Sequence, residues 1–169
     1  STVAVTTIAG QTTAGTTNGI GTVATFSTPV GVTVSPDNSY ALIAEASGAM
    51  IRKLILSTSE VTTLAGAPSN QGTTNGIGSN ALFTYPTDII FSSDGSYILL
   101  TDQTVHLIRK VVISTAAVTT LIGGAAGSSD GIGTNALLFK PRDISFSPDQ
   151  SFIIISDTDN NLLRLAMLS

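Results

Sequence analysis

The sequence contains no cysteine and no tryptophan, and it is poor in charge and in aromatic residues. Among its 169 residues there is one histidine, charged residues make up 11%, and aromatic residues make up 5%. The lack of cysteine excludes a disulfide framework, thiol catalysis and a zinc ribbon. A single histidine excludes most histidine-rich metal sites. No apolar run approaches the roughly 18 residues that a membrane-spanning helix needs.

The balance of charge also argues against nucleic acid as a partner. Seven basic residues stand against 11 acidic ones, for a net charge of −4. Phosphate contacts from lysine and arginine supply most of the affinity for nucleic acids, so a net acidic chain is poorly suited to that role. We therefore expect no nucleic-acid partner.

Small hydroxyl side chains and apolar residues make up most of the chain. There are 25 threonines and 20 serines, and hydrophobic residues account for 42%. That hydrophobic content is enough for a packed core and excludes wholesale disorder. Low charge with a high hydroxyl content favours an extracellular or cell-surface location. The threonine-rich segments 11–17 and 71–74 are either plain polar loops or sites of O-glycosylation.

A six-residue segment occurs three times, which indicates an internal repeat. Its copies are Val5–Gly10, Val61–Gly66 and Val118–Gly123, spaced by 61 − 5 = 56 and 118 − 61 = 57 residues. Other residues recur in step with it. They are Pro29, Pro86 and Pro141; Asp37, Asp94 and Asp149; Arg52, Arg109 and Arg164; and the Gly-Ile-Gly steps at 19–21, 76–78 and 131–133.

Each repeat has the pattern of short β-strands separated by turns. In the first repeat the strands are predicted at residues 31–34, 40–44, 50–56 and 61–64, where apolar and β-branched residues lie between turn-forming ones. No stretch shows a helical period. Each unit is therefore predicted to be a four-stranded antiparallel meander, and the fold class all-β. Long loops rich in glycine, threonine and asparagine are expected at 11–28, 67–85 and 124–140.

The second repeat resembles the NHL repeat. A proline, an apolar strand, an Asp-Gly turn and a second apolar strand ending in aspartate run from Pro86 to Asp102, and Ile108-Arg109-Lys110 follows. This resemblance implies β-propeller blades, at 29–66, at 86–123 and at 141–169. Because NHL-type propellers resemble six-bladed rings, three blades imply half of a ring or a segment of a propeller array or filament.

The blades are expected to be out of phase with the chain. Residues 1–10 match the outer strand of a blade, whereas the blade at 141–169 lacks its outer strand. Because unpaired edges offer free hydrogen-bonding groups, we expect the first strand to pair with the last strand of another copy. A two-chain ring, a filament and a fragment of a longer array all stay open. The residues expected to pair in this assembly are Val5, Thr6, Thr7 and Ile8 of the first strand and Leu162, Leu163, Leu165 and Met167 of the last strand.

Two further sets of charged residues are candidate sites. An acid precedes each repeated arginine by seven residues, which predicts strand-to-strand ion pairs. Asp88 and Asp143 each start an innermost strand and offer two oxygen ligands to Ca²⁺, or they bond loop amides instead. Gly31 stands at the matching place in the first repeat. The predicted ion pairs are Glu45 with Arg52, Asp102 with Arg109, and Asp157 with Arg164.

These observations favour a non-catalytic, extracellular scaffold module that assembles by inter-chain strand complementation. His106 is expected in an exposed turn. The amidating lyases, which resemble this fold, rely on several histidine ligands that the chain does not have, so we expect no enzyme. The alternative is a protein- or glycan-binding six-bladed propeller made by two chains. The expected partner is another copy, or other extracellular proteins or glycans. No cofactor is expected, apart from Ca²⁺.

Overall fold

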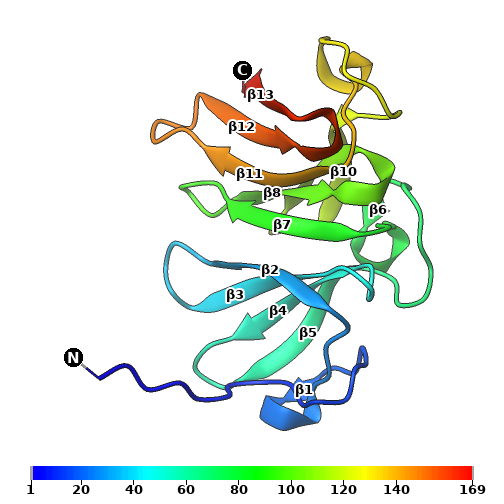
Figure 1. Ribbon diagram of the computed structural model, residues 1–169. Coiled ribbons are helices and arrows are strands. Elements are labelled where there is room, and N and C mark those ends of the chain that lie inside the picture. Colours follow the sequence, from blue (N-terminus) through cyan, green and yellow to red (C-terminus); the bar gives the residue numbers. More distant parts are fainter. Residues whose placement is uncertain (1, 169) are drawn as a thin grey trace.

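A computed structural model describes residues 2–168, so the outermost residues of the predicted segments 1–10 and 141–169 lie outside the described part. It contains three antiparallel sheets stacked one on another (Figure 1). The first sheet contains β1 (Gly19–Ile20), β2 (Pro29–Val34), β3 (Tyr40–Glu45), β4 (Met50–Ile55) and β5 (Glu60–Gly66). The second contains β6 (Gly76–Ile77), β7 (Pro86–Phe91), β8 (Tyr97–Asp102), β9 (Leu107–Val112) and β10 (Ala117–Gly123). The third contains β11 (Pro141–Phe146), β12 (Phe152–Asp157) and β13 (Leu162–Met167).

The only helical elements of the described chain are short 3₁₀ turns. They are η1 (Gly21–Val23), η2 (Gly78–Asn80), η3 (Gln103–Val105), η4 (Gly133–Asn135) and η5 (Thr158–Asn160). Across residues 2–168 no helix has the length and apolar character to cross a membrane. The predicted all-β class of antiparallel propeller blades is thus confirmed.

The strand order shows that two blades have one strand more than the sequence indicated. The orders are β1-β5-β4-β3-β2, β6-β10-β9-β8-β7 and β11-β12-β13. The extra strands lie within the predicted loops 11–28 and 67–85, where Ile20 pairs with Glu60 and Ile77 with Ala117. Each of these sheets thus contains the four predicted strands and one more, which the sequence did not indicate because a two-residue strand is too short to show an alternating pattern.

A repeated serine–aspartate turn joins the first two long strands of each sheet. In the first sheet Asp37 Oδ1 accepts hydrogen bonds from Ser35 Oγ at 2.6 Å and from the Ser39 amide at 3.0 Å. These bonds, first of all the one from Ser35, lower the pKa of Asp37 to about 2. Asp94 and Asp149 make the same bonds in the other sheets. The local side-chain bonds explain why the chain turns there.

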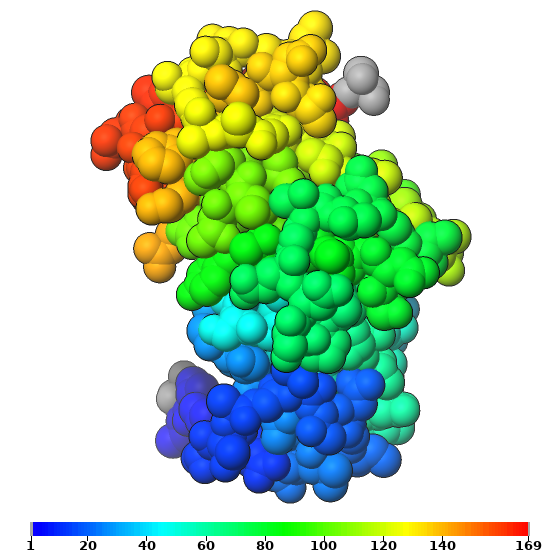
Figure 2. Space-filling view, turned by 90° about the vertical axis from the view of Figure 1, so that its right-hand side faces the viewer, coloured from blue at the N-terminus to red at the C-terminus, as the bar shows by residue number. Residues whose placement is uncertain are grey.

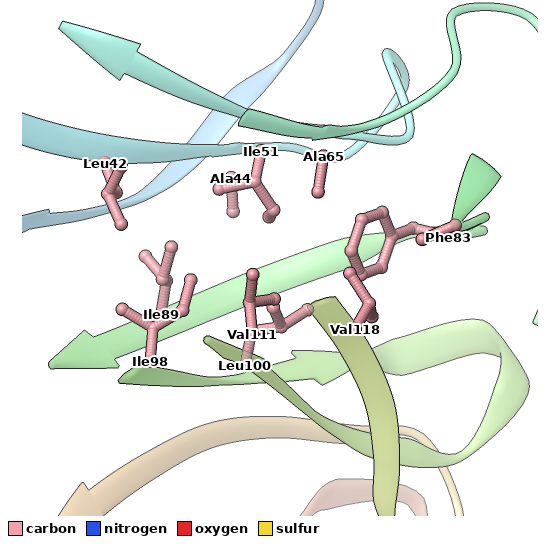
Figure 3. Close-up of a cluster of buried hydrophobic side chains, with 11 residues drawn as sticks. Leu42, Ala44, Ile51, Ala65, Phe83, Ile89, Ile98, Leu100, Val111 and Val118 are labelled. Carbon is pink, nitrogen blue, oxygen red and sulfur yellow. The ribbon is translucent and has the colours of Figure 1, made fainter. Parts of the chain in front are cut away.

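The core lies between successive sheets. Leu42 and Ile51 of the first sheet face Ile89 and Leu100 of the second (Figure 3), and all four are at most 1% exposed. A second apolar cluster joins the second sheet to the third. The first strands of the sheets lie side by side, β2 against β7 and β7 against β11. This places β2, β7 and β11 where a propeller has its axis.

Candidate assembly site

Strand β13 forms an open edge of the third sheet. In the first two sheets the corresponding strands, β4 and β9, are paired on both sides, with β5 and β10 on the outside. Among the residues that the structure describes, β13 pairs only with β12. Within residues 2–168, the outer edge of β13 thus carries backbone groups that no strand pairs with.

A groove of about 760 Å³ runs along this edge. It is bounded by β13 and by the segment around η4, including Ile132 and Leu138. Ile132 is 90% exposed, whereas the corresponding Ile20 and Ile77 are 62% and 61% exposed. The difference follows from strand pairing, since Ile20 and Ile77 belong to the short strands β1 and β6. The groove thus lies where β5 and β10 lie in the other two sheets.

An acceptor for a threonine hydroxyl stands in this groove. In the first sheet Asn18 Oδ1 accepts a hydrogen bond from Arg52 Nη2 at 2.8 Å and one from Thr63 Oγ1 at 3.3 Å. Asn75 binds Arg109 and Thr120 in the same way. In the third sheet Asp130 Oδ1 binds Arg164 Nη2 at 2.7 Å, and the Asp130 side chain is 98% exposed. A threonine in an added outer strand would donate to Asp130 the hydrogen bond that Thr63 donates to Asn18 and Thr120 to Asn75.

The predicted strand at residues 4–8 forms no strand within the described chain. Val5 is 92% and Ile8 53% exposed. A lone extended segment has no neighbouring strand with which to form a hydrogen-bond ladder, which explains the difference from the sequence prediction. Whether the segment pairs with another copy stays a prediction.

Residues 8–10, at the end of this segment, nevertheless lie in the position of an outer strand that belongs to a preceding sheet. The Gly10 amide donates to Gly21 O at 3.1 Å, and Gly10 has a φ of +93°, as has Gly66 at the end of β5. Ile8 O lies beside Gly21 as Leu64 O lies beside Gly78. Residues 8–10 therefore contact η1 as residues 64–66 contact η2.

In each of the three predicted acid–arginine pairs the two side chains lie close together, but the distance between them differs from pair to pair. Arg52 Nη1 lies 2.7 Å from Glu45 Oε1, Arg109 Nη1 lies 3.7 Å from Asp102 Oδ2, and Arg164 Nη1 lies 3.0 Å from Asp157 Oδ2. Burial raises the pKa of Glu45, raises that of Asp102 to about 6 and lowers that of Arg109.

The arginines also hold the long segments that precede each blade. Arg52 donates to Thr17 O and Thr25 O, at 3.0 and 3.1 Å. Arg109 and Arg164 make the same kind of bonds to the segments 67–85 and 124–140. Figure 2 shows the three long segments one above another on one side of the molecule. The sequence signal for this role is the Asn or Asp that precedes each Gly-Ile-Gly step, at positions 18, 75 and 130.

The two candidate cation ligands meet on the inner strands. Asp88 and Asp143 line a cavity of about 680 Å³. Asp88 Oδ2 accepts a hydrogen bond from the Ile144 amide at 2.9 Å. Burial, and then the hydrogen bond and charge of Asp143, raise the pKa of Asp88 to about 6. Since residues 2–168 hold no cluster of three potential ligands, Ca²⁺ binding stays a prediction.

The single histidine is half-buried rather than exposed. His106 has a φ of +64°, consistent with the predicted turn. Its Nδ1 accepts a hydrogen bond from the Lys140 amide at 3.1 Å, and its ring packs edge-on against Phe139. The side chain thus ties the second sheet to the segment that enters the third, a contact across 34 residues that local sequence does not reveal.

Comparison with known proteins supports the fold. No family model matches the chain. It is 33% identical over 147 residues to Protein SUPPRESSOR OF QUENCHING 1, chloroplastic, of Arabidopsis thaliana, a match that covers 82% of this chain and 14% of that protein.

Solved structures of similar fold include an auxiliary nutrient binding protein from Bacteroides ovatus, with a TM-score of 0.73 and 22% identity. That match covers 82% of this chain and 37% of the other. Virginiamycin B lyase from Staphylococcus aureus matches with a TM-score of 0.54 and 17% identity, over 84% of this chain and 42% of the other. The chain thus spans less than half of each of these proteins and shares a β-propeller fold with the solved ones.

Proposed function

We propose that this propeller module is a non-catalytic scaffold that assembles with copies of itself by adding a strand from one chain to a sheet of the next. Residues 4–10 of one copy become the outer strand of the third sheet of another. The observation that carries the proposal is the groove beside β13, which occupies the place of β5 and β10 and is open in the described chain.

The register of the added strand follows from the first sheet. There Arg52 pairs with Thr63, and Leu54 pairs with Val61. Transferred by the sequence repeat, Arg164 lies opposite Thr7 of the other copy. Thr7 then reaches Asp130 as Thr63 reaches Asn18, so the added strand satisfies a side-chain acceptor as well as the backbone of β13.

Two features support a scaffold rather than an enzyme. The single histidine is engaged with a backbone amide, which leaves it poorly placed as a general base. The buried acids pair with arginines or bond to loop amides, so their arrangement serves to hold the blades together. A hydroxyl-rich, sparsely charged composition favours an extracellular or cell-surface site for such a scaffold.

A discrete ring that binds a ligand is the second candidate. It is favoured by the likeness to auxiliary nutrient binding proteins from Bacteroides. Two copies joined by strand addition at both ends would form a six-bladed ring, which would offer its loops to a protein or a glycan. A mass fixed at two copies favours this alternative, and a mass that grows with concentration favours a filament.

The test is to remove backbone donors from the assembly strand. In Thr6→Pro/Thr7→Pro the proline rings eliminate two amide protons in an exposed segment. We expect the 169-residue chain to exceed its 17.2 kDa monomer mass in light scattering and the variant to run as a monomer with unchanged circular dichroism. Thr2→Pro is the matched control, since residue 2 precedes the predicted pairing. A monomeric wild type, or a variant that assembles like wild type, contradicts the proposal.

A further inference from the structure

We infer that two exposed sheet faces, at opposite ends of the stack, form a blade-to-blade junction between copies. The third sheet of one copy packs on the first sheet of the next, as the first sheet packs on the second within one chain. The inference rests on the proposed function for its partner, a second copy of this chain. One of the two faces, on β2, lies apart from the strand groove, whereas the other, on β13, also lines that groove.

The first of these surfaces is the β2 face, made of Val30, Val32 and Val34. These side chains are 51%, 67% and 48% exposed. The residues that correspond to Val32 in the other sheets, Ile89 and Ile144, are 1% and 4% exposed because the preceding sheet covers them. The β2 face is therefore an inter-sheet surface without its covering sheet in the described chain.

The second surface is the β13 face, made of Leu163, Leu165 and Met167. Their exposed fractions are 78%, 57% and 69%. The residues that correspond to Leu163 are Ile51 and Ile108, and both are fully buried against the following sheet. The two faces are thus the two complementary halves of the junction that occurs twice within the chain.

The position of the N-terminal segment indicates how the β2 face and the β13 face come together. Residues 8–10 contact η1 as the end of β5 contacts η2. They therefore lie where a sheet preceding the first would have its outer strand. Ala9 already packs with Ile43 and Val61 on that side of the first sheet. A third sheet that takes up this strand is necessarily brought beside the β2 face.

Specific contacts within the chain indicate which residues meet across the junction. Each internal junction has an edge-to-face aromatic pair, Tyr40 with Phe91 at 5.8 Å and Tyr97 with Phe146 at 6.3 Å between ring centroids. The corresponding pair between copies is Phe152 with Val34, where the smaller side chain leaves room for a larger one.

The inner strands indicate a hydrogen bond across the same junction. Asp88 of the second sheet accepts from the Ile144 amide of the third at 2.9 Å. Asp143 is the corresponding acid of the third sheet, and Val32 stands at the place of Ile144. Asp143 therefore accepts the amide of Val32 in the next copy. This contact gives the Asp143 carboxylate a backbone donor in the next copy, in addition to its neighbour Asp88.

The experiment measures assembly of chains changed on each face. Val32→Lys and Leu163→Lys place a charge in the apolar junction and are expected to give monomers in sedimentation velocity, with melting temperatures unchanged because both sites are exposed. Ile77→Lys is the matched control, since Ile77 is 61% exposed on β6, away from both faces. Val34→Phe restores the aromatic pair and should tighten assembly about threefold to tenfold.

The outcomes separate this inference from the strand proposal. If Val32→Lys and Leu163→Lys assemble like wild type while Thr6→Pro/Thr7→Pro does not, the junction is wrong and strand addition stands. If the lysine variants dissociate while the proline variant assembles, the junction stands and strand addition is wrong. If all of them assemble like wild type, both are overturned.

Discussion

The repeated arginines show how one side-chain type can hold a blade together. Each places its guanidinium between an acid on the neighbouring strand and carbonyls of a long segment. Arg52 and Arg109 leave Nε without a hydrogen-bond partner in the described structure, and their guanidinium groups lie 5.5 and 5.4 Å from the ring centres of Phe26 and Phe83. The ring face partly compensates for the missing acceptor.

The Asp102 pair is the widest of the three because both carboxylate oxygens of Asp102 also accept the Thr84 amide. Glu45 has one methylene more than Asp102, and its carboxylate reaches Arg52 at 2.7 Å. Asp102 instead accepts the amides of Thr84 and Tyr85, at 3.1 and 2.7 Å, and stays 3.7 Å from its arginine. The sequence spacing of seven residues predicted the pairs but not this division of their bonds.

Loss of Arg52 should be costly because it leaves a buried acid alone. We expect Arg52→Met to lower the free energy of unfolding by about 3–5 kcal/mol. The double variant Glu45→Gln/Arg52→Met should recover part of this loss. Urea denaturation measures both, with Lys53→Met, a half-exposed neighbour on the same strand, as the control. A cost below about 1 kcal/mol for the single change would show that the pair is not a main support of the blade.

At the scale of elements, the long strands were predictable and the short ones were not. The predicted strand 40–44 corresponds to β3, and 61–64 lies within β5, because apolar and β-branched runs between turns are strong signals. β1 and β6 have two residues each, and their pairing depends on the fold of the whole sheet. Residues 4–8 have the same local pattern as β5 but no partner strand in the described chain.

The register of strand addition can be tested by cross-linking. Lys53 pairs with Thr62 in the first sheet, so Leu165 should lie opposite Thr6 of another copy. Because these 169 residues contain no cysteine, the Thr6→Cys and Leu165→Cys chains contain one thiol each. Mixed and oxidised, they should form a mixed disulfide, seen by non-reducing electrophoresis and mass spectrometry.

The control for this register replaces the residue next to Leu165. The Cβ of Ala166 points to the opposite face of the sheet, so Ala166→Cys should cross-link poorly with Thr6→Cys. Equal yields for the two pairings would mean that the strand does not add in the expected register, even if the copies associate.

At the scale of the whole molecule, the contacts between sheets include one that depends on pH. Asp88 joins β7 to the Ile144 amide of β11, and burial raises its pKa to about 6, above the ordinary value of 3.8. The folded state therefore binds this proton more tightly than the unfolded state. Its contribution is fully present below about pH 4 and is lost as the pH rises through 6.

Removing this titrating group should flatten the pH dependence of stability. We expect the free energy of unfolding of the wild type to fall by about 1–2 kcal/mol from this group between pH 4 and pH 7, since half-burial leaves the carboxyl partly screened. In Asp88→Asn the fall should be smaller, as measured by urea denaturation at a series of pH values. Asp94→Asn is the control, because the pKa of Asp94 is lowered rather than raised. An unchanged slope in Asp88→Asn would contradict the assignment.

The bonds between each arginine and its long segment have a mechanical consequence. The sheets follow one another along the chain, and the long segment before each sheet is bonded to that sheet by its repeated arginine. We therefore expect a pulling force on the two ends to load the blades in series. The bonds from each arginine to its long segment would resist this force before a sheet separates. The repeat spacing of 118 − 61 = 57 residues corresponds to about 200 Å of extended chain. Such a module would lengthen under tension in blade-sized steps rather than yield gradually.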